Sequence, residues 1–516
     1  MPPRASLKTF LATARAALAA PASKRTTPLT FVVGNESADL DSLCSALLLA
    51  YFHTYAPPKK RASIGDGNVN GNGGGSSRTL HIPVCHLYRA DLALRPEFAA
   101  VLRDADVRGE DMFTLEDVLP PPPQQQQGGR GGSRGRDGGD ANNEIEIAPE
   151  DTRWLLVDHN EMTGPLASRF ASRVVGCVDH HADEGVVPRD ATPRVIEKSG
   201  SCASLVLERC AEIWEALGGG ARGEDGSGSG SGGEKRRGGD NKMVEKVEDG
   251  ARIDAQLARV ALAPILIDTS NLGDKSKTTA HDEGAVALAE AKIAAYEEAT
   301  MTENGVRAAG EEKEKEGEGV DSRYDRAALF ARLSALKDDL QHMSFRDVLR
   351  KDYKEWGAGG LNLATSSVPR GFGYLLARKA GGDVAAVASA IRSWGEERDG
   401  SLAGKEKEEE KMDLVVVLTT FVDDEGTFSR ELLVSARSEM GVKAAELFAD
   451  KRGGELGLET WGDGILDSGL EKNGEGKGDG DGVIWRRCWR QKAVQHSRKQ
   501  IAPMLRDALK EVAGRG

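Results

Sequence analysis

The sequence lacks a long hydrophobic run, a paired-cysteine motif and an excess of basic residues, and each absence excludes a class of protein. No apolar run approaches the ~20 residues of a membrane-spanning helix, so we expect no membrane partner. The six cysteines are scattered without a CxxC pair, which favours reduced thiols in an intracellular protein. The formal net charge of -13 argues against a nucleic-acid partner. The sequence does not indicate an oligomeric state.

Acidic residues are also absent from the first 30 positions. This segment carries Arg4, Lys8, Arg15, Lys24 and Arg25, and its residues Leu7, Phe10, Leu11 and Ala14 have helical spacing. A mitochondrial transit peptide has this character, whereas the alternative is a folded surface helix that precedes the first strand. We favour the folded helix, and therefore a cytoplasmic location over the mitochondrial matrix.

The length and composition indicate two domains separated by polar, glycine-rich segments. With 516 residues the chain is long enough for two or three domains, and its 62 glycines are concentrated in low-complexity stretches that cannot bury a core. We predict a first domain at 1–303, a linker at 304–322 and a second domain at 323–516. Disordered insertions are expected near 59–78, 120–143 and 218–241, and further insertions near 400–411 and 451–482.

Four apolar runs are followed by acidic residues or histidines. The runs are Leu29–Val33, Trp154–Val157, Val174–Val178 and Pro264–Ile267, and the polar residues that follow them are Asp39 and Asp41, Asp158, Asp179 with His180 and His181, and Asp268. The first three runs are typical of buried strands. Open α/β sheets bind ligands at the carboxyl ends of their strands, so we expect these side chains to converge.

The segment with Asp39 and Asp41 has an alternative explanation, and so does a further segment at the start of another helix. Asp39 and Asp41 either reach one cation or cap the helix that follows them, and the sequence does not favour one reading over the other. The small residues of Ser199–Ser204, at the start of another helix, either cradle a phosphate with exposed N–H groups or permit close packing of helix against sheet. We favour close packing.

The converging side chains predict a site for two metal ions. Four carboxylates with one or two imidazoles suit manganese or magnesium better than zinc, which prefers thiolates. The ligands outnumber those that one octahedral ion with open positions needs, so two divalent ions sharing a carboxylate fit better. Such a pair of ions activates a water and clamps a phosphoryl transfer.

The stretch Trp485–Leu505 has six cations and no acid, and it either binds phosphate or is a solvated helix face.

These motifs together resemble the DHH phosphoesterase superfamily. The relevant segments, in order, are Gly34–Ser42, Val157–Asn160, Val178–His181, Gly200–Ser204 and Ile267–Asn271; Lys351–Lys354 and Ser497–Gln500 resemble the DHH-associated C-terminal domain. The resemblance is strongest to the eukaryotic cytosolic exopolyphosphatases, relatives of prune and of family II inorganic pyrophosphatases. It implies an α/β fold with an N-terminal parallel-sheet DHH domain, a smaller C-terminal α/β domain, and an active site in the cleft between them.

The resemblance also implies roles for individual residues. The metal ligands would be Asp39, Asp41, Asp158, His180 and Asp268, with Asp158 bridging two ions. His181 would face the phosphate and donate a proton, while Asn35 and Asp179 would support the ligands. The phosphate would be bound by Lys354, Arg498 and Lys499. Family II pyrophosphatases have His where Asn35 stands, which favours the exopolyphosphatase branch.

The expected function is therefore an exopolyphosphatase that removes the terminal phosphate of linear inorganic polyphosphate with a metal-activated water. The alternatives are a prune-like phosphohydrolase of short polyphosphates or nucleotide phosphates, and a scaffold without catalysis.

Overall fold

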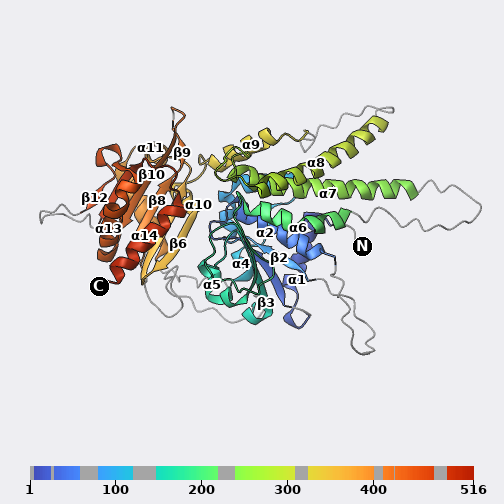
Figure 1. Cartoon of the computed structure of the whole chain (residues 1–516), viewed down its shortest axis with the longest axis horizontal. Coiled ribbons are helices and arrows are strands. Elements are labelled where there is room, and N and C mark those ends of the chain that lie inside the picture. Colours follow the sequence, from blue (N-terminus) through green and yellow to red (C-terminus); the bar gives the residue numbers. More distant parts are fainter. Residues whose placement is uncertain are drawn as a thin grey trace, which may run out of the picture. The chain divides into compact units, whose positions relative to one another are not determined.

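The computed structural model describes residues 5–24, 28–57, 79–119, 147–218, 239–307, 323–399, 411–423, 425–469 and 485–515. The chain divides into two compact units (Figure 1): Met1–Met162 with Arg169–Ser334, and Thr163–Ser168 with Ala335–Gly516. The predicted insertions at 59–78 and 120–143 lie outside the described residues, as do most of the predicted insertions at 218–241 and 400–411 and most of the predicted linker.

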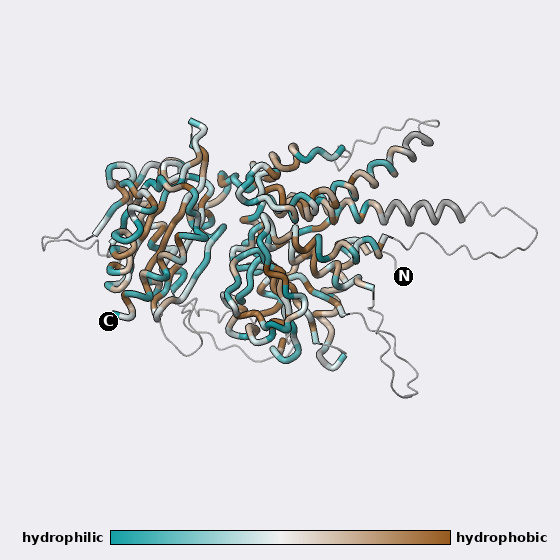
Figure 2. Tube along the Cα trace, in the orientation of Figure 1, coloured by the Kyte–Doolittle hydropathy of each residue, from teal (hydrophilic) through white to brown (hydrophobic). Residues whose placement is uncertain are grey.

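The first unit is built on a parallel five-stranded sheet, as predicted. Its strands are β1 (Leu29–Val33), β2 (His81–Val84), β3 (Thr152–Val157), β4 (Val174–Asp179) and β5 (Arg194–Ile196). They lie in the order β2-β1-β3-β4-β5, and every neighbouring pair is parallel. The near-continuous apolar runs of β1 and β3 suit strands covered on both faces. In Figure 2 these strands are brown, the colour of hydrophobic residues.

Helices account for most of the other described residues of the first unit. They are α1 (Leu7–Ala19), α2 (Leu40–Tyr55), α3 (Pro96–Asp104), α4 (Leu115–Val118), α6 (Cys202–Gly218), α7 (Gly239–Asp268) and α8 (Ala280–Arg307), while α5 (Gly164–Phe170) and α9 (Arg326–Asp338) include residues of both units. Short 3-10 turns lie at Ala22–Lys24, Arg89–Leu94, Gly109–Asp111, Pro149–Asp151 and Ala171–Arg173. The apolar side of α1 is buried, which confirms the folded N-terminal helix. None of the described helices is long and apolar enough to cross a membrane.

The apolar run at 264–267 differs from the other three because it is helical. It forms the end of α7, a helix of 30 residues that contains Pro264 and closes at Asp268. The short run alone does not distinguish a buried strand from a buried helix, and here the helical pattern of the preceding residues continues through it. Asp268 is therefore the last residue of a helix and does not follow a sheet strand.

The second unit contains a mixed sheet with helices on both faces. Its strands are β6 (Tyr353–Ala358), β7 (Leu361–Val368), β8 (Leu414–Thr419), β9 (Phe421–Val422), β10 (Phe428–Ala436), β11 (Leu458–Thr460), β12 (Ser468–Gly469) and β13 (Trp485–Gln491). The main order is β11-β13-β10-β8-β7-β6, in which β7 and β8 are parallel and the other pairs are antiparallel. The predicted C-terminal α/β domain is thus confirmed.

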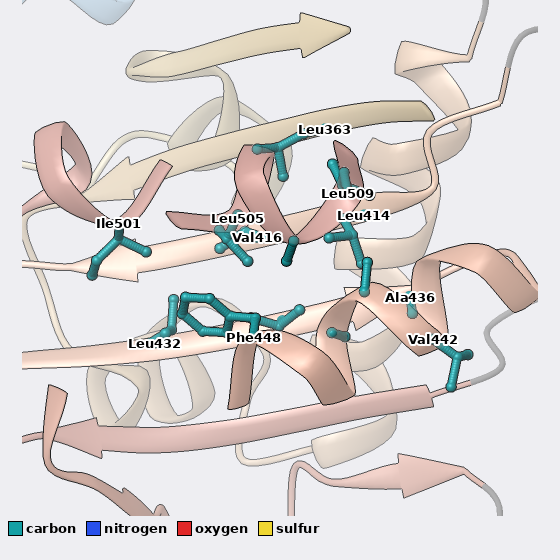
Figure 3. Close-up of a cluster of buried hydrophobic side chains, with 14 of the residues drawn as sticks. Leu363, Leu414, Val416, Leu432, Ala436, Val442, Phe448, Ile501, Leu505 and Leu509 are labelled. Atoms are coloured by element: carbon teal, nitrogen blue, oxygen red, sulfur yellow. The ribbon is translucent and has the colours of Figure 1, made fainter. Parts of the chain in front are cut away.

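The two faces of this sheet have separate cores. On one face α13 (Glu439–Leu456) and α14 (Arg498–Ala513) cover strand residues such as Leu363 and Leu432, and Phe448 of α13 packs in the same core (Figure 3). On the other face α10 (Phe345–Lys351), α11 (Phe372–Tyr374), the π-helical turn Leu375–Lys379 and α12 (Val384–Arg398) pack against the alternate strand residues. Successive strand residues point to opposite faces, so each strand feeds both cores.

The insertion predicted at 451–482 begins too early. Residues 451–456 continue α13, and β11, the 3-10 turn Gly462–Gly464 and β12 follow, while residues 470–482 lie outside the described part of the chain. The glycines of the described segment 453–469 include several in turns with positive φ. Gly457 has a φ of 58° and ends α13 in the left-handed conformation, which glycine adopts without a steric penalty.

Candidate active site

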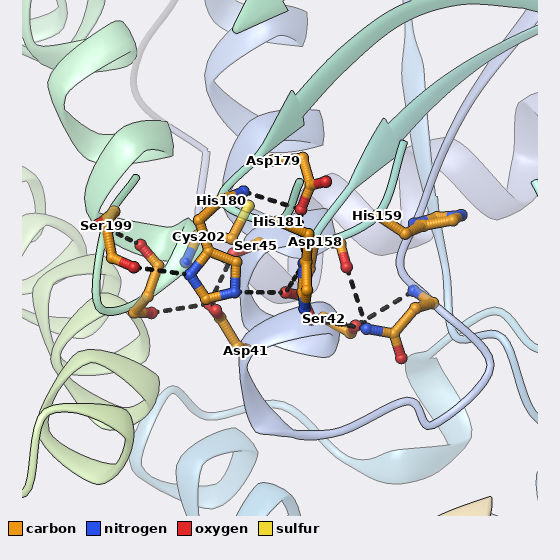
Figure 4. A network of polar contacts seen from close by, with 12 residues as sticks. Asp41, Ser42, Ser45, Asp158, His159, Asp179, His180, His181, Ser199 and Cys202 are labelled. Carbon is orange, nitrogen blue, oxygen red and sulfur yellow. Dashed lines mark hydrogen bonds and ion pairs between the residues drawn. The ribbon is translucent and has the colours of Figure 1, made fainter. Parts of the chain in front are cut away.

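Asp158 is the centre of a buried polar network at the carboxyl end of β3 (Figure 4). Asp158 is 2% exposed, and its backbone has a left-handed φ of 61°. The carboxylate accepts hydrogen bonds from Asn35 Nδ2 at 2.8 Å and Ser42 Oγ at 2.7 Å. His180 Nε2 lies 3.1 Å from Asp158 Oδ1. The network holds this carboxylate in one orientation.

His180 and His181 follow β4, the neighbouring strand. His180 Nδ1 lies 3.0 Å from the carbonyl oxygen of Ser199, which requires a proton on Nδ1. Without a bound cation, Nε2 can also carry a proton and donate it to Asp158 Oδ1, whereas in the neutral ring Nε2 turns a lone pair towards that oxygen. Two electron-rich atoms facing each other at 3.1 Å suit a cation bound by both. The local geometry therefore fits a metal ligand pair.

One ligand atom from each of Asp158, His180 and His181 lies within 4.8 Å of the others. Carboxylate oxygen and imidazole nitrogen are donors that divalent first-row metals accept. The sequence prediction assigns His181 to phosphate and not to metal, whereas the structure places it beside both Asp158 and His180.

Asp179 fixes the orientation of His181. Asp179 is fully buried at the end of β4, and its Oδ1 lies 2.8 Å from His181 Nδ1. The other oxygen accepts a bond from Asn160 Nδ2 at 2.5 Å. Burial alone would raise the pKa of Asp179, but its hydrogen bond with His181 and the charge of that ring lower it overall. His181 is thus held by an ionised carboxylate.

Asp41 lies near the same acids and also caps a helix. Its carboxylate accepts bonds from the N–H groups of Cys202 at 2.6 Å and Ala203 at 2.9 Å, in the first turn of α6. Burial, followed by the charges of Asp158 and Asp268, raises the pKa of Asp41 well above its usual range. The like charges show that these acids share one neighbourhood, which a cation would stabilise.

Asp39 is at the N-cap of α2, where its side chain accepts the N–H of Ser42 at 3.0 Å. The capping interpretation of this position is confirmed. Asp39 also contributes to the raised pKa of Asp41, so it lies close to the acid group as well. Its role as a metal ligand stays a prediction.

The charges around Asp158 differ from those around Asp41. Burial alone would raise the pKa of Asp158, but the hydrogen bond with His180 and the charges of both histidines lower it overall. Asp158 is therefore ionised, whereas Asp41 is biased towards its protonated form in the absence of a cation.

The Ser199–Ser204 segment packs closely and is not an open phosphate cradle. The N–H groups of Gly200 and Ser201 bond to the buried Asp282, at 2.9 and 3.2 Å. A Cβ on Gly200 would lie 2.6 Å from Thr269 Cγ2, so only glycine fits there. Close packing, the favoured interpretation, is confirmed, because carboxylates already occupy the N–H groups that a phosphate would need.

A buried arginine shapes the loop that carries Asp39 and Asp41. Arg95, 5% exposed, donates from Nε to the carbonyl of Ala38 at 2.9 Å and from Nη2 to that of Ser37 at 2.5 Å. Ala38 has a left-handed φ of 42°. His86 Nδ1 lies 3.1 Å from the carbonyl of Gly34 at the start of the same loop. Two residues from a later segment thus hold the loop by its main chain.

The sequence interpretation missed several of these residues. Ser42 and Asn160 lie inside the motifs and are polar residues adjacent to the predicted ligands, a signal that was available. In the sequence, Asp282 looks like an ordinary acid in the first turn of α8. Arg95 looks like an isolated cation before α3. Nothing local distinguishes these two, because their partners lie far away in the sequence.

The three predicted phosphate-binding cations lie in the second unit. Lys354 is on β6, and Arg498 and Lys499 begin α14. Arg498 Nη2 pairs with Asp352 Oδ1 at 2.7 Å, and Nη1 donates to the carbonyl of Asp352 at 3.1 Å. Lys499 is exposed. Asp352 thereby links the start of α14 to the start of β6.

The basic stretch 485–505 is not one helix face. Its first seven residues form β13, and its helical part begins at Arg498. Arg486 is buried on β13 and donates to the carbonyl of Leu466 at 2.7 Å. The alternative of a solvated helix face is therefore wrong for the strand part of the stretch.

Comparisons with known proteins match both units. The model of the DHH family, N-terminal domain, matches residues 30–224, and that of the DHHA2 domain matches residues 331–508. A Schizosaccharomyces pombe protein named "Putative exopolyphosphatase" is 26% identical over 486 residues, 94% of this chain and 92% of that protein. The crystal structure of a Methanococcus jannaschii putative family II inorganic pyrophosphatase aligns with a TM-score of 0.43 and 17% identity, over 93% of this chain and 99% of that one. With both domain models in the predicted order and the motifs at the strand ends, the chain belongs to the DHH phosphoesterase superfamily.

Proposed function

We propose that this protein is an exopolyphosphatase that hydrolyses the terminal phosphate of linear inorganic polyphosphate. The observation that carries the proposal is the convergence of Asp158, His180 and His181 at the carboxyl ends of β3 and β4. The relative named for exopolyphosphatase activity aligns along 94% of the chain, which supports the same substrate class.

The acids and His180 are proposed to hold two divalent cations, manganese or magnesium. The residues would be Asp39, Asp41, Asp158, His180 and Asp268, with Asp158 shared between the ions. Divalent cations bound there would neutralise phosphate charge and make water a better nucleophile at neutral pH. The lone pair of His180 Nε2 facing Asp158 and the raised pKa of Asp41 both fit such an occupant.

Asp158 and His180 are proposed to act through their fixed positions. The side chains of Asn35 and Ser42 hold the Asp158 carboxylate, and the Ser199 carbonyl orients the His180 ring. A site that is already ordered before substrate arrives loses little free energy to reorganisation during the reaction.

His181 is proposed to donate a proton to the leaving oxygen. As water attacks the terminal phosphorus, the bond from that phosphorus to the bridging oxygen breaks, and the shortened chain needs a proton on its new end. Asp179 holds Nδ1 of His181, so Nε2 is the nitrogen that delivers the proton. The ionised Asp179 also stabilises the positively charged ring beforehand.

Asn35 is proposed to favour polyphosphate over pyrophosphate. Its amide nitrogen donates to Asp158, and its amide oxygen accepts the N–H of Ser37 at 2.9 Å. Both ends of the amide are therefore occupied, and an amide is a weaker metal ligand than the histidine of family II pyrophosphatases.

Phosphate oxygens would be bound by Lys354, Arg498 and Lys499, and the guanidinium of Arg498 would hold two of them at once.

The test is orthophosphate release from a panel of substrates: long-chain polyphosphate, tripolyphosphate, pyrophosphate and ATP, each with magnesium and with manganese. We expect release from long-chain polyphosphate, with products that shorten one unit at a time on a gel. Hydrolysis of pyrophosphate alone would contradict the proposal. Hydrolysis of ATP or tripolyphosphate alone would support the prune-like alternative, and inactivity on every substrate would support the scaffold alternative.

A further inference from the structure

One end of the sheet in the second unit carries polar and basic side chains on the face covered by α14. The residues, from β6 across to β13, are Lys354, Ser367, Thr420, Arg430 and Gln491. The strand register places them together, since Lys354 pairs with Thr365, Val368 with Thr419, and Arg430 with Gln491.

Side-chain alternation fixes the face on which these residues lie. Trp356 and Ala358 on β6, and Leu432 and Val434 on β10, pack in the core under α13 and α14. Because residues two apart in a strand share a face, Lys354 and Arg430 point to the α14 side of the sheet. Arg498 and Lys499, the first residues of α14, lie at the same end through the Arg498–Asp352 pair.

Arg430 is a half-buried cation, and its partners among the described residues are neutral groups. Its Nε donates to the carbonyl of Val494 at 2.7 Å, and its Nη1 donates to Thr420 Oγ1 at 2.6 Å. The guanidinium lies 5.2 Å from the ring centre of Phe428. Among the described residues no carboxylate pairs with Arg430, and no described residue accepts a hydrogen bond from Nη2.

A cation in this environment lacks a balancing charge. Burial lowers the pKa of Arg430, and no acid in the described part of the chain opposes that effect. An arginine nevertheless stays protonated in proteins, so the positive charge persists. Two of its nitrogens are already oriented by protein acceptors, which leaves Nη2 for an anionic oxygen. Thr420 accepts from Nη1, so its hydroxyl proton is free to point to the same anion.

The cations are spread along the sheet end and not gathered at one point. Lys354 lies on β6 and Arg430 on β10, which are three strands apart, or roughly 14 Å at the usual strand spacing. A single phosphate is too small to contact both. A linear polyanion that crosses the strands would contact Lys354, the start of α14 and Arg430 in turn.

We propose that Arg430 and Thr420 bind an internal phosphate of polyphosphate, several units away from the terminal phosphate. This inference rests on the proposed function, in which Lys354, Arg498 and Lys499 bind the end of the chain. Arg430 would then select for chain length, because tripolyphosphate is too short to reach it. The sheet end would bind long substrates more tightly without taking part in bond cleavage.

The test compares KM for long-chain polyphosphate and for tripolyphosphate. Arg430→Ala should raise KM for the long chain by roughly 10-fold or more, as expected for a lost charge-assisted hydrogen bond, with kcat and tripolyphosphate kinetics close to wild type. Arg430→Lys keeps the charge and should fall between the two. Thr420→Val keeps the side-chain shape and should give a smaller rise in KM. Arg452→Ala, on the exposed surface of α13, is the matched control.

Binding without turnover gives an independent readout. In an Asp158→Asn background, adding Arg430→Ala should weaken equilibrium binding of long-chain polyphosphate and reduce its salt dependence, since one phosphate contact is lost. Equal KM and equal binding for Arg430→Ala and Arg452→Ala, in a protein that hydrolyses long-chain polyphosphate, would overturn this inference alone. A wild-type protein that neither binds nor hydrolyses polyphosphate would overturn the proposed function, and this inference with it.

Discussion

One end of the first sheet and one end of the second sheet carry side chains of opposite charge. The ligand end of the first sheet gathers buried acids and histidines that bond to one another, whereas the α14 end of the second sheet presents cations with Asp352 as the acid bonded to Arg498. Buried polar groups need complete sets of partners, so the first region has a fixed geometry. The cations of the second region, such as Arg430 and Lys499, are half-buried or exposed, so this region can adapt to its ligand.

This contrast separates two kinds of contribution. The first region fixes where metal ions and the reacting phosphorus would sit, and a small displacement there is expected to affect the chemical step strongly. The second region supplies positive charge to a flexible polyanion, and its residues should contribute in graded amounts. Substitutions in the first region are therefore expected to lower turnover more than substitutions in the second.

The largest effect is expected from Asp158→Asn. Asn tolerates the left-handed backbone of this position, so the fold should persist. The loss of the shared carboxylate should lower kcat on polyphosphate by roughly 10³-fold or more. The measurement is orthophosphate release together with thermal unfolding. Asp190→Asn, an exposed position of the same unit, is the control. A folded Asp158→Asn protein with near-wild-type activity would refute the two-metal site.

A smaller effect is expected from Arg498→Ala in the second region. The loss of a cation that binds the terminal phosphate should cost about 2–4 kcal/mol, or some 10²–10³ in rate. Arg498→Lys keeps the charge without the fork and should also be impaired, as should Lys499→Ala. Lys510→Ala, an exposed position of the same helix, is the matched control.

The Arg498 result needs to be separated from its ion pair. Asp352→Asn removes the partner of Arg498 but leaves the cation in place. We expect Asp352→Asn to retain more activity than Arg498→Ala, in measurements of kcat and KM on polyphosphate. Equal small effects of Arg498→Ala and Lys510→Ala would assign Arg498 a structural role only.

Metal removal should destabilise the first region more than the second. Divalent ions that bind the folded site stabilise it by about 2.7 kcal/mol at a concentration 100 times the dissociation constant. Addition of manganese or magnesium to chelator-treated protein should therefore raise the unfolding temperature, and Asp158→Asn should reduce that rise. Sodium chloride at matched ionic strength is the control. An unfolding temperature that divalent ions leave unchanged would contradict the metal site.

The effect that is smallest near neutral pH concerns acid stability. Burial, followed by the charge of His159, lowers the pKa of His86 to about 3, and burial lowers that of His81 to about 4. Unfolded histidine titrates near pH 6.5, so the unfolded chain binds more protons between these values. Stability should therefore fall as the pH drops below about 6.5, by up to ~1.4 kcal/mol per pH unit for each histidine.

Replacement of His86 isolates its share of this acid sensitivity. His86→Asn removes the titrating ring, so its free energy of unfolding should depend less on pH between 6.5 and 4 than that of the wild type. The measurement is urea unfolding at several pH values, and His342→Asn, an exposed histidine of the second unit, is the control. An unchanged pH slope in His86→Asn would show that the ring binds a proton as readily in the folded protein as in the unfolded chain.

The strand ends were predictable because their signal is local. An apolar run followed at once by Asp158, or by Asp179, His180 and His181, specifies both the strand and the polar residues at its end. The order of the motifs then indicated the superfamily. Asp268 follows an equally apolar run that proved helical, since a four-residue run does not distinguish the two structures.

Other parts of the site depend on contacts between distant segments. Asp41 caps α6 from about 160 positions away, and Asp282 bonds to Gly200 across 82 positions. No spacing within either segment records these pairings. The basic stretch at 485–505 likewise divides into a strand and a helix, because the sheet provides β13 with partners that its own residues do not reveal.

The hydrogen bonds from Arg95 to the loop that carries Asp39 and Asp41 couple this loop to α3. Arg95 reaches Ser37 and Ala38 across 58 and 57 positions of the chain, at the point where α3 begins. The loop that carries Asp39 and Asp41 therefore acquires its shape only when α3 is docked. Amide hydrogens of this loop and of α3 should then exchange with solvent through one shared opening event. A local fluctuation of a helix that carries none of the proposed ligands would dismantle the site while the strands of the sheet stay paired.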